Sequence, residues 1–357
     1  MDEGPTDDNP KDDGTTGDGP TDDNSATIDV RGAGSIRLRA GVVGPSDGPP
    51  VVLLHGGGQT RHSWRRTARL LGDAGWRAYS VDLRGHGDSD WAADGDYSLE
   101  AFAADVFEIA VALDRPPALV GASLGGVASL AALGATPPAP GAALVLVDVA
   151  PRVERAGTDR ISEFMRFRLE EGFGSLEEVA DAIAAYNPNR PRPKDLSGLA
   201  KNVRRRPDGR WRWHWDPRFL IGSPQSEDET RVTVVQPEPL EAAARSLTIP
   251  VLLVRGGQSD LLSAEGARRF LEVVPDAELV DVEGAGHMIA GDRNDVFNES
   301  IVEFLARRAA PAAAAAPAAT TGSAAAPAAT AGPEPEPTRV RSPLAAPGVG
   351  RPVDGRS

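Results

Sequence analysis

The sequence has no cysteine, and its 357 residues include only three lysines and five histidines. Without cysteine the chain cannot form disulfides, bind a metal through thiolates or use a cysteine nucleophile. It has no run of about 18 apolar residues, which argues against a transmembrane helix. The first 24 residues are acidic and lack the apolar segment of a secretory signal, so we expect a cytoplasmic protein that does not enter a membrane.

The negative charge is concentrated at one end of the chain. Residues 1–24 carry nine carboxylates and one lysine, a net charge of −8 out of −14 for the whole chain. The remainder is only mildly acidic, which argues against nucleic acid as a partner. We therefore expect a small-molecule substrate and no nucleic-acid partner, whereas the oligomeric state stays open.

Composition divides the chain into a central region and two tails. Residues 1–25 are polar and repeat the hexapeptide GPTDDN, and residues 309–357 are rich in alanine and proline. Neither segment can bury enough apolar surface to offset its ordering entropy, so both are predicted to be disordered. Residues 26–150 and 241–308 are predicted to form the core, with residues 151–240 inserted as a cap.

The core alternates short β-branched runs with amphipathic stretches. This alternation predicts a doubly wound, mostly parallel, eight-stranded α/β sheet with helices on both faces. Two early strands, near 27–30 and 35–43, are expected at an antiparallel edge, and helices are expected at 61–74 and 98–113. The other six strands are predicted at 51–55, 77–83, 117–122, 143–149, 250–256 and 277–282.

The alternation stops in the inserted segment. Helical patterns occur at 158–171 and 175–186, and a Pro-Asp-Gly turn then precedes tryptophans at every second position, which predicts a hairpin with three indoles on one face. An insertion directly after a strand lies over the carboxyl edge of the sheet, where ligands bind in α/β folds. The side chains expected to line a substrate pocket there are Phe164, Phe167, Tyr186 and Trp213.

Ser123 is the candidate nucleophile. It lies in Gly121-Ala122-Ser123-Leu124-Gly125, after an apolar run and before a helical stretch. A serine in a strand-turn-helix segment of this kind adopts a strained backbone conformation that requires small neighbours. The turn raises its hydroxyl above the sheet beside a helix N-terminus, which favours developing negative charge.

A serine hydroxyl needs a base, and His287 is the best placed of the five histidines. It follows the last predicted strand in a glycine-rich loop, at the same sheet edge as Ser123. His55 ends a strand and is interpreted as structural, and His86 is interpreted as bracing a turn. His62 and His214 have no comparable context.

The acid that orients the histidine should follow a neighbouring strand. Asp260 follows the strand at 250–256 and gives the chain order serine, aspartate, histidine. Asp148, at the end of the preceding strand, is the alternative, since it would reach the same sheet edge. We favour Asp260 and keep Asp148 open.

Backbone amides must stabilise the oxyanion of an acyl-transfer reaction. One donor is expected to be the amide of Leu124, immediately after the nucleophile. The second is expected in the glycine loop His55-Gly56-Gly57-Gly58, with Gly57 preferred and Gly58 next.

Taken together, these segments resemble the α/β-hydrolase fold superfamily over about residues 26–308. The resemblance rests on HGGG, DLRGHGDS, GASLGG, the Asp260 loop and GAGHM, which occur in the superfamily's order. Within it the chain looks like capped esterases and cofactor-free haloperoxidase-like enzymes. It differs from epoxide hydrolases and haloalkane dehalogenases, which carry an aspartate where Ser123 stands.

The resemblance implies a serine hydrolase that cleaves a carboxylic ester or related acyl bond, with no metal or organic cofactor. Alternatives are a haloperoxidase or perhydrolase, in which peroxide replaces water, and a lactone or carbon–carbon bond hydrolase. A non-catalytic ligand-binding protein of the same fold is the least favoured, because all members of a triad are present.

Overall fold

The eight-stranded sheet follows from the alternating apolar runs of the sequence. A computed structural model describes residues 26–187, 192, 195–221, 236–287 and 295–309. The strands lie in the order β1-β2-β4-β3-β5-β6-β9-β10. Their bounds are Ala26–Arg31 (β1), Arg37–Val43 (β2), Pro50–Leu54 (β3), Arg77–Val81 (β4), Ala118–Ala122 (β5), Ala143–Val147 (β6), Val251–Gly256 (β9) and Glu278–Val282 (β10).

The pairing confirms the predicted doubly wound, mostly parallel fold. Strand β2 is antiparallel to both β1 and β4, whereas the pairs from β4 through β3, β5, β6 and β9 to β10 are parallel. Since parallel strands end at the same edge, the loops that follow β3, β4, β5, β6, β9 and β10 gather there. This edge contains the sequence motifs singled out above.

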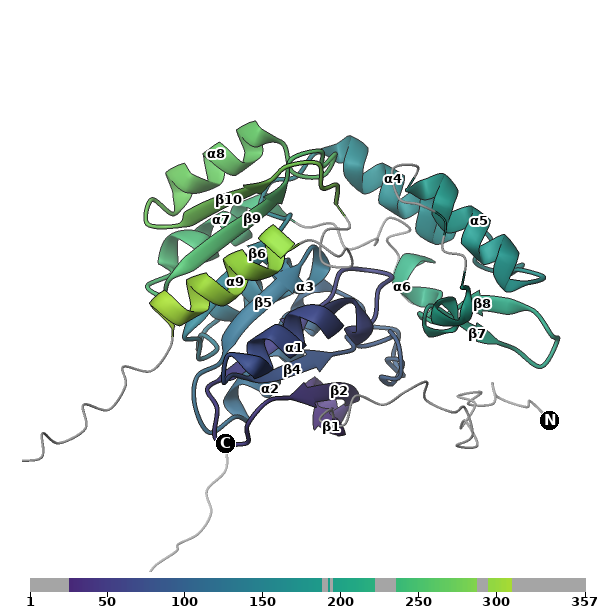
Figure 1. The fold of residues 1–357 in the computed structure, drawn as a ribbon, viewed down its shortest axis with the longest axis horizontal. Coiled ribbons are helices and arrows are strands. Elements are labelled where there is room, and N and C mark those ends of the chain that lie inside the picture. The colour runs from purple at the N-terminus through teal and green to yellow at the C-terminus, as the bar shows by residue number, and fades with distance from the viewer. Residues whose placement is uncertain (1–25, 188–191, 193–194, 222–235, 288–294, 310–357) are drawn as a thin grey trace, which may run out of the picture. The chain divides into compact units, whose positions relative to one another are not determined.

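Helices cover both faces of the sheet, as Figure 1 shows. On one face, α1 and α9 share a hydrophobic core with Val51 and Leu53 of β3. On the other face, α2, α3, α7 and α8 share a second core with Val52 and Leu54, the alternate side chains of the same strand. The helix bounds are Arg65–Asp73 (α1), Leu99–Val111 (α2), Leu124–Gly134 (α3), Pro237–Ser246 (α7), Ala264–Val273 (α8) and Asp295–Arg308 (α9).

Local signals account for several helix ends. Ser98 caps α2 by accepting the amide of Ala101, and Ser263 caps α8 by accepting the amide of Gly266. The helix predicted at 61–74 is divided into a short 3-10 turn, Arg61–Trp64 (η2), followed by α1. A further 3-10 turn, Ala33–Ser35 (η1), joins β1 to β2.

The segment between β6 and α7, residues 148–236, interrupts the alternation of strands and helices. Its described residues form three helices, a two-stranded hairpin and a 3-10 turn, which lie together on the right of Figure 1. Tight turns at Arg168 and Gly172, both with positive φ, follow α4, which ends earlier than the predicted 171. The elements are Arg155–Arg166 (α4), Leu176–Tyr186 (α5), Ser197–Lys201 (η3), Val203–Arg205 (β7), Trp211–Trp213 (β8) and Arg218–Ile221 (α6).

The inserted segment forms ion pairs or backbone hydrogen bonds with two of the loops at the carboxyl edge. Arg204 on β7 forms an ion pair with Asp88 in the loop after β4, at 2.7 Å. The amide of Asp216 donates to the carbonyl of Gly85 in the same loop. On the opposite side, Arg160 of α4 pairs with Asp260 after β9 at 2.6 Å. These contacts hold the segment against the loops that carry the candidate catalytic residues.

The predictions for the two tails, 1–25 and 309–357, concern residues that lie outside the described part of the chain, apart from Ala309. None of the helices in the described ranges combines the length and apolar character that crossing a bilayer requires.

Candidate active site

Ser123 lies in a strained turn between β5 and α3. Its backbone angles are φ 45° and ψ −114°, a region in which residues other than glycine cost about 1–3 kcal/mol. Its amide donates to the carbonyl of Val147 on β6 at 3.1 Å, and its own carbonyl accepts the amides of Gly126 and Val127. The strained residue is therefore held from both the sheet and the helix.

The glycines beside Ser123 are required by close backbone packing. A methyl group on Gly121 would lie 2.4 Å from backbone atoms of Gly125 and Gly126. A methyl group on Gly125 would lie 2.4 Å from the carbonyl oxygen of Leu54 on β3. Neither contact can be relieved by a side-chain rotation, so the GxSxG spacing lets α3 approach the sheet closely enough to form this turn.

His287 lies in the loop after β10 and bonds to a carboxylate. Its Nδ1 is 2.7 Å from Oδ2 of Asp148, the residue that follows β6. Because a carboxylate accepts, Nδ1 carries the proton and Nε2 is left as the basic nitrogen. Loop bonds support the placement: Gly257 donates to Val282, and Gln258 donates to Ala285 at 2.8 Å.

The Asp148 carboxylate is enclosed and accepts three hydrogen bonds. Besides His287, the amide of Gly256 donates to Oδ1 at 2.9 Å and the Ser259 hydroxyl donates to Oδ2. The side chain is fully buried, and its backbone has a positive φ of 51°. These hydrogen bonds hold the carboxylate in place and so fix the position of the imidazole.

The structure places Asp148, the alternative kept open in the sequence analysis, at the histidine and not the preferred Asp260. The Asp260 side chain is 39% exposed and forms an ion pair with Arg160 of α4. Within the loop after β9, Ser259 turns inward instead, and its Oγ also accepts the amides of Leu261 and Leu262. The chain order alone could not distinguish the two carboxylates, because both follow strands that end at the same edge.

The glycine loop after β3 leaves one amide available. Within Gly56–Gly58, Gly56 donates to Oε1 of Gln59 at 3.0 Å, and Gly58 donates to Nε2 of His86 at 3.1 Å. The amide of Gly57 makes no hydrogen bond within the described residues, and the same holds for Leu124 at the start of α3. Gly58, the second choice for an oxyanion donor, is therefore already occupied.

Three further histidines are buried beside this loop. His55 donates from Nδ1 to the Gly56 carbonyl and accepts the Leu83 amide at Nε2, which requires a neutral ring. Burial lowers the pKa of His55 to about 4 and that of His86 to about 3, and it lowers the pKa of His214 well below 6.5. The prediction from sequence had no role for His214, because its contacts lie far away along the chain.

The predicted pocket residues cluster within the inserted segment. Phe164 stacks on Tyr186 with ring centroids 4.2 Å apart, and it lies 5.5 Å from Trp213. The indole nitrogen of Trp213 donates to the carbonyl of Phe167, whose own ring is largely exposed. The role of these four side chains in substrate binding stays a prediction.

Other side chains of the segment lie directly over the glycine loop. A methyl group on Gly57 would lie 3.6 Å from the ring of Phe219 and 3.8 Å from the sulfur of Met165. On Gly58 it would lie 3.3 Å from Trp215, which stacks on Trp213 at 4.9 Å. Sequence reasoning missed Met165 and Phe219, because their apolar character by itself indicates only packing.

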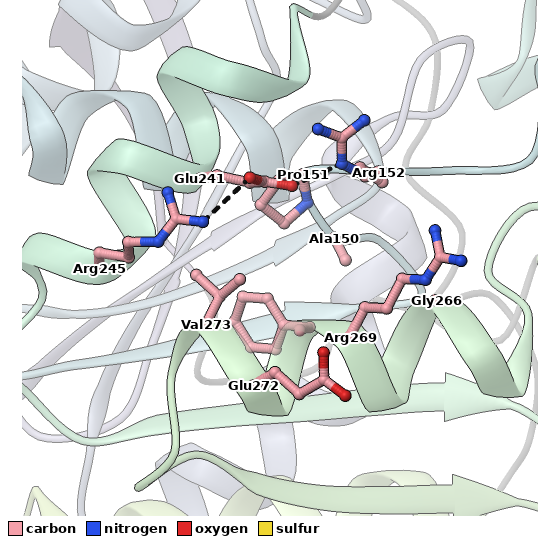
Figure 2. A pocket seen from close by; sticks show the side chains of 10 residues that line it. Ala150, Pro151, Arg152, Glu241, Arg245, Gly266, Arg269, Glu272 and Val273 are labelled. Atoms are coloured by element: carbon pink, nitrogen blue, oxygen red, sulfur yellow. Dashed lines mark hydrogen bonds and ion pairs between the residues drawn. The ribbon is translucent and has the colours of Figure 1, made fainter.

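A cavity of about 200 Å³ lies elsewhere, between α7, α8 and the residues after β6 (Figure 2). None of the candidate catalytic residues lines it. Arg152 and Arg245 both pair with Glu241, and Arg269 pairs with Glu265, so each arginine that lines the cavity has a carboxylate partner. The lining residues are Ala150, Pro151, Arg152, Glu241, Arg245, Gly266, Arg269, Phe270, Glu272 and Val273.

A parallel sheet with a strained serine at a strand-to-helix turn defines a class of hydrolases. Sequence comparison agrees: the Alpha/beta hydrolase family profile matches residues 51–300. The chain belongs to this family and is a hydrolase.

Relatives at modest identity include an esterase and a non-heme chloroperoxidase. The chain is 29% identical to esterase Rv0045c of Mycobacterium tuberculosis, over 76% of this chain and 89% of the relative. A solved structure of that esterase gives a TM-score of 0.59 at 28% identity, over 81% of this chain and 93% of that one. The chain is 27% identical to a non-heme chloroperoxidase of Kitasatospora aureofaciens, over 72% and 92% of the two chains.

Proposed function

We propose that the protein is a serine hydrolase that cleaves a carboxylic ester or related acyl bond. The observations that carry the proposal are the strained Ser123 at the end of β5 and the His287–Asp148 pair at the same edge of the sheet. Ser123 is bonded through its amide to Val147, the residue before Asp148, so the nucleophile and the acid stand at the ends of adjacent strands. The esterase relative is consistent with this chemistry.

In this mechanism, His287 moves the proton. Nε2 of His287 takes the hydroxyl proton as Ser123 Oγ attacks the carbonyl carbon, and Asp148 stabilises the resulting imidazolium through Nδ1. The tetrahedral oxyanion accepts hydrogen bonds from the amides of Leu124 and Gly57, neither of which donates to another described residue. His287 then protonates the leaving alcohol, and the same residues direct water onto the acyl-enzyme.

The inserted segment, residues 151–240, is proposed to act as a cap that selects the substrate. Its Met165 and Phe219 lie over the glycine loop, where the acyl group of a bound ester would be located. Phe164 contacts both Tyr186 and Trp213 in the same segment, and these three rings would form a further part of the pocket wall. An apolar lining of this kind favours an ester with an apolar acyl group.

Perhydrolysis is a second candidate, favoured by the similarity to the chloroperoxidase. The acyl-enzyme would then react with hydrogen peroxide instead of water, giving a peracid and free serine. Peracid formed from acetate and peroxide oxidises bromide, so bromination of a phenol reports this activity. The Ser123→Ala variant must lose bromination together with ester cleavage if both reactions use the same acyl-enzyme.

The proposal is tested with p-nitrophenyl esters from acetate to palmitate and with a fluorophosphonate probe. Wild-type protein should hydrolyse at least one ester and be labelled at Ser123. Ser123→Ala should lose labelling and about 10⁴- to 10⁶-fold in turnover, with unchanged thermal unfolding. A Ser123→Ala variant that keeps more than about a tenth of the activity would refute the nucleophile, because a residue of a catalytic unit contributes far more.

A further inference from the structure

Two buried histidines outside the proposed triad bond to one residue of the glycine loop. His86, in the loop after β4, is fully buried, and His214, in the inserted segment, is 2% exposed. Nε2 of His86 accepts the amide of Gly58 at 3.1 Å, whereas Nε2 of His214 lies 3.4 Å from the Gly58 carbonyl. Both the amide and the carbonyl of Gly58 thus contact a histidine ring.

The second nitrogen of each ring fixes which nitrogen carries the proton. Nδ1 of His86 donates to the Arg84 carbonyl at 2.9 Å, which makes Nε2 an acceptor for the Gly58 amide. Nδ1 of His214 accepts the amide of Gly87 at 2.7 Å, which makes Nε2 a donor toward the Gly58 carbonyl. Both rings are therefore neutral and oriented, and Phe219 packs edge-on against His86 at 5.0 Å.

The loop needs such support because glycines do not restrict their own backbone. Gly58 has φ +74°, and the loop has no side chain at three successive positions. Gln59 holds the start of the loop through the Gly56 amide, and His86 holds its end through the Gly58 amide. The peptide groups on either side of the Gly57 amide are thereby fixed, which sets the direction of that amide.

We propose that His86 and His214 are positioning residues that aim the Gly57 amide at the oxyanion, so that the inserted segment supports catalysis through His214. The inference rests on the proposed acyl-transfer function. It assigns the segment more than substrate selection: contact of His214 with Gly58 links the position of the segment to the rate of the chemical step.

Two amide replacements separate the bonds of His86. In His86→Gln the side-chain oxygen reaches the place of Nε2 and can accept the Gly58 amide. In His86→Asn the amide group reaches only the place of Nδ1 and keeps the bond to Arg84 instead. We expect His86→Asn to lower kcat for an ester and the rate of phosphonylation by about 10- to 100-fold, with KM nearly unchanged. We expect His86→Gln to stay within about threefold of wild type, because the amide direction is kept.

His214 gives a second, independent pair in case a His86 variant does not fold. His214→Gln keeps the donor toward Gly58, and His214→Asn keeps the acceptor for Gly87. The slower variant should again be the one that loses the bond to Gly58, although by less, since the 3.4 Å contact is long. Trifluoromethyl ketones, which form an oxyanion on the serine, should lose affinity in parallel with kcat.

A control variant removes a buried hydrogen bond between α1 and α9. The Thr67 hydroxyl donates to Oδ1 of Asn298 at 2.7 Å, so Thr67→Val should lower the unfolding temperature and leave kcat unchanged. The positioning role would be overturned if, for both histidines, the Asn and Gln variants had the same kcat. It would also be overturned if the variants changed KM alone. Wild-type protein that resists phosphonylation would instead refute the proposed serine chemistry itself.

Discussion

Asp148 and Asp260 follow strands that end at the same edge of the sheet, yet their surroundings differ sharply. Asp148 is buried and receives the Gly256 amide, the Ser259 hydroxyl and the His287 ring. Asp260 is partly exposed and faces a guanidinium of the inserted segment. Only a buried, multiply bonded carboxylate holds an imidazole in one tautomer.

Replacing the two carboxylates separately therefore tests whether Asp148 is the acid that orients His287. Asp148→Asn should lower kcat by roughly 10⁴, because an amide at that position favours the wrong tautomer of His287. Asp260→Asn should leave kcat within about a few-fold, since an exposed ion pair contributes about 0–1 kcal/mol. Steady-state ester hydrolysis by both variants decides the matter, and a greater loss in Asp260→Asn would restore the original assignment.

The glycines around Ser123 lead to a second prediction for single residues. Gly121→Ala should lower the free energy of unfolding by about 1–3 kcal/mol or more, because its methyl group meets backbone atoms of the next helix at 2.4 Å. Gly41→Ala is the control, since a methyl group there meets nothing within 4 Å. Urea denaturation of both variants should show a shift for the first alone, and comparable stabilities would contradict the proposed close approach.

At the scale of elements, the inserted segment is joined to the core at separate points. Arg160 of α4 reaches the loop after β9, whereas Arg204 and Asp216 reach the loop after β4. Between these contacts, Met165 and Phe219 face the glycine loop. The segment therefore borders the site on its apolar side without supplying a member of the proposed triad.

Met165→Ala should alter the selectivity between esters more than the reactivity of Ser123. Losing an apolar contact is worth about 1–3 kcal/mol, so kcat/KM should change unevenly between short and long acyl chains. Labelling of Ser123 by a small phosphonate should change little. Phe167→Ala serves as a comparison, because the exposed Phe167 ring is expected to have a smaller effect. A uniform loss across all esters, with slower labelling, would indicate that Met165 supports the glycine loop instead.

For the whole molecule, the buried neutral histidines make stability depend on pH. Burial lowers the pKa of His55 to about 4 and of His86 to about 3, whereas an unfolded histidine titrates near 6.5. Below about pH 6.5 the unfolded chain binds protons that the folded chain does not, so the free energy of unfolding falls as pH decreases toward 4. Above about pH 6.5 these histidines add no pH dependence to the free energy of unfolding.

Urea unfolding between pH 7.5 and 5 measures this effect. Each such histidine should contribute up to about 1.4 kcal/mol per pH unit in the lower part of the range. His86→Gln removes one of them and should give a shallower decline than wild type. A decline of the same steepness in both proteins would mean that His86 does not titrate with folding.

Much of this protein could be predicted from local patterns in its sequence. β-branched runs separated by amphipathic stretches determine a parallel sheet covered on both faces, because each strand must bury both of its sides. The spacing of glycines around Ser123 indicates the strained turn, since only missing side chains permit its close contacts. The glycine-rich loop after the last strand likewise singles out His287.

Only the tertiary structure shows which of two candidate carboxylates bonds to His287. Asp148 and Asp260 are indistinguishable along the chain, and the difference arises because Ser259, one residue earlier, turns inward and Asp260 turns toward Arg160. The contact of His214 with Gly58 joins positions 156 residues apart, and no local pattern encodes it. Hydrogen bonds between distant loops depend on how the elements pack, and that packing placed Asp148 at His287 and two histidine rings at Gly58.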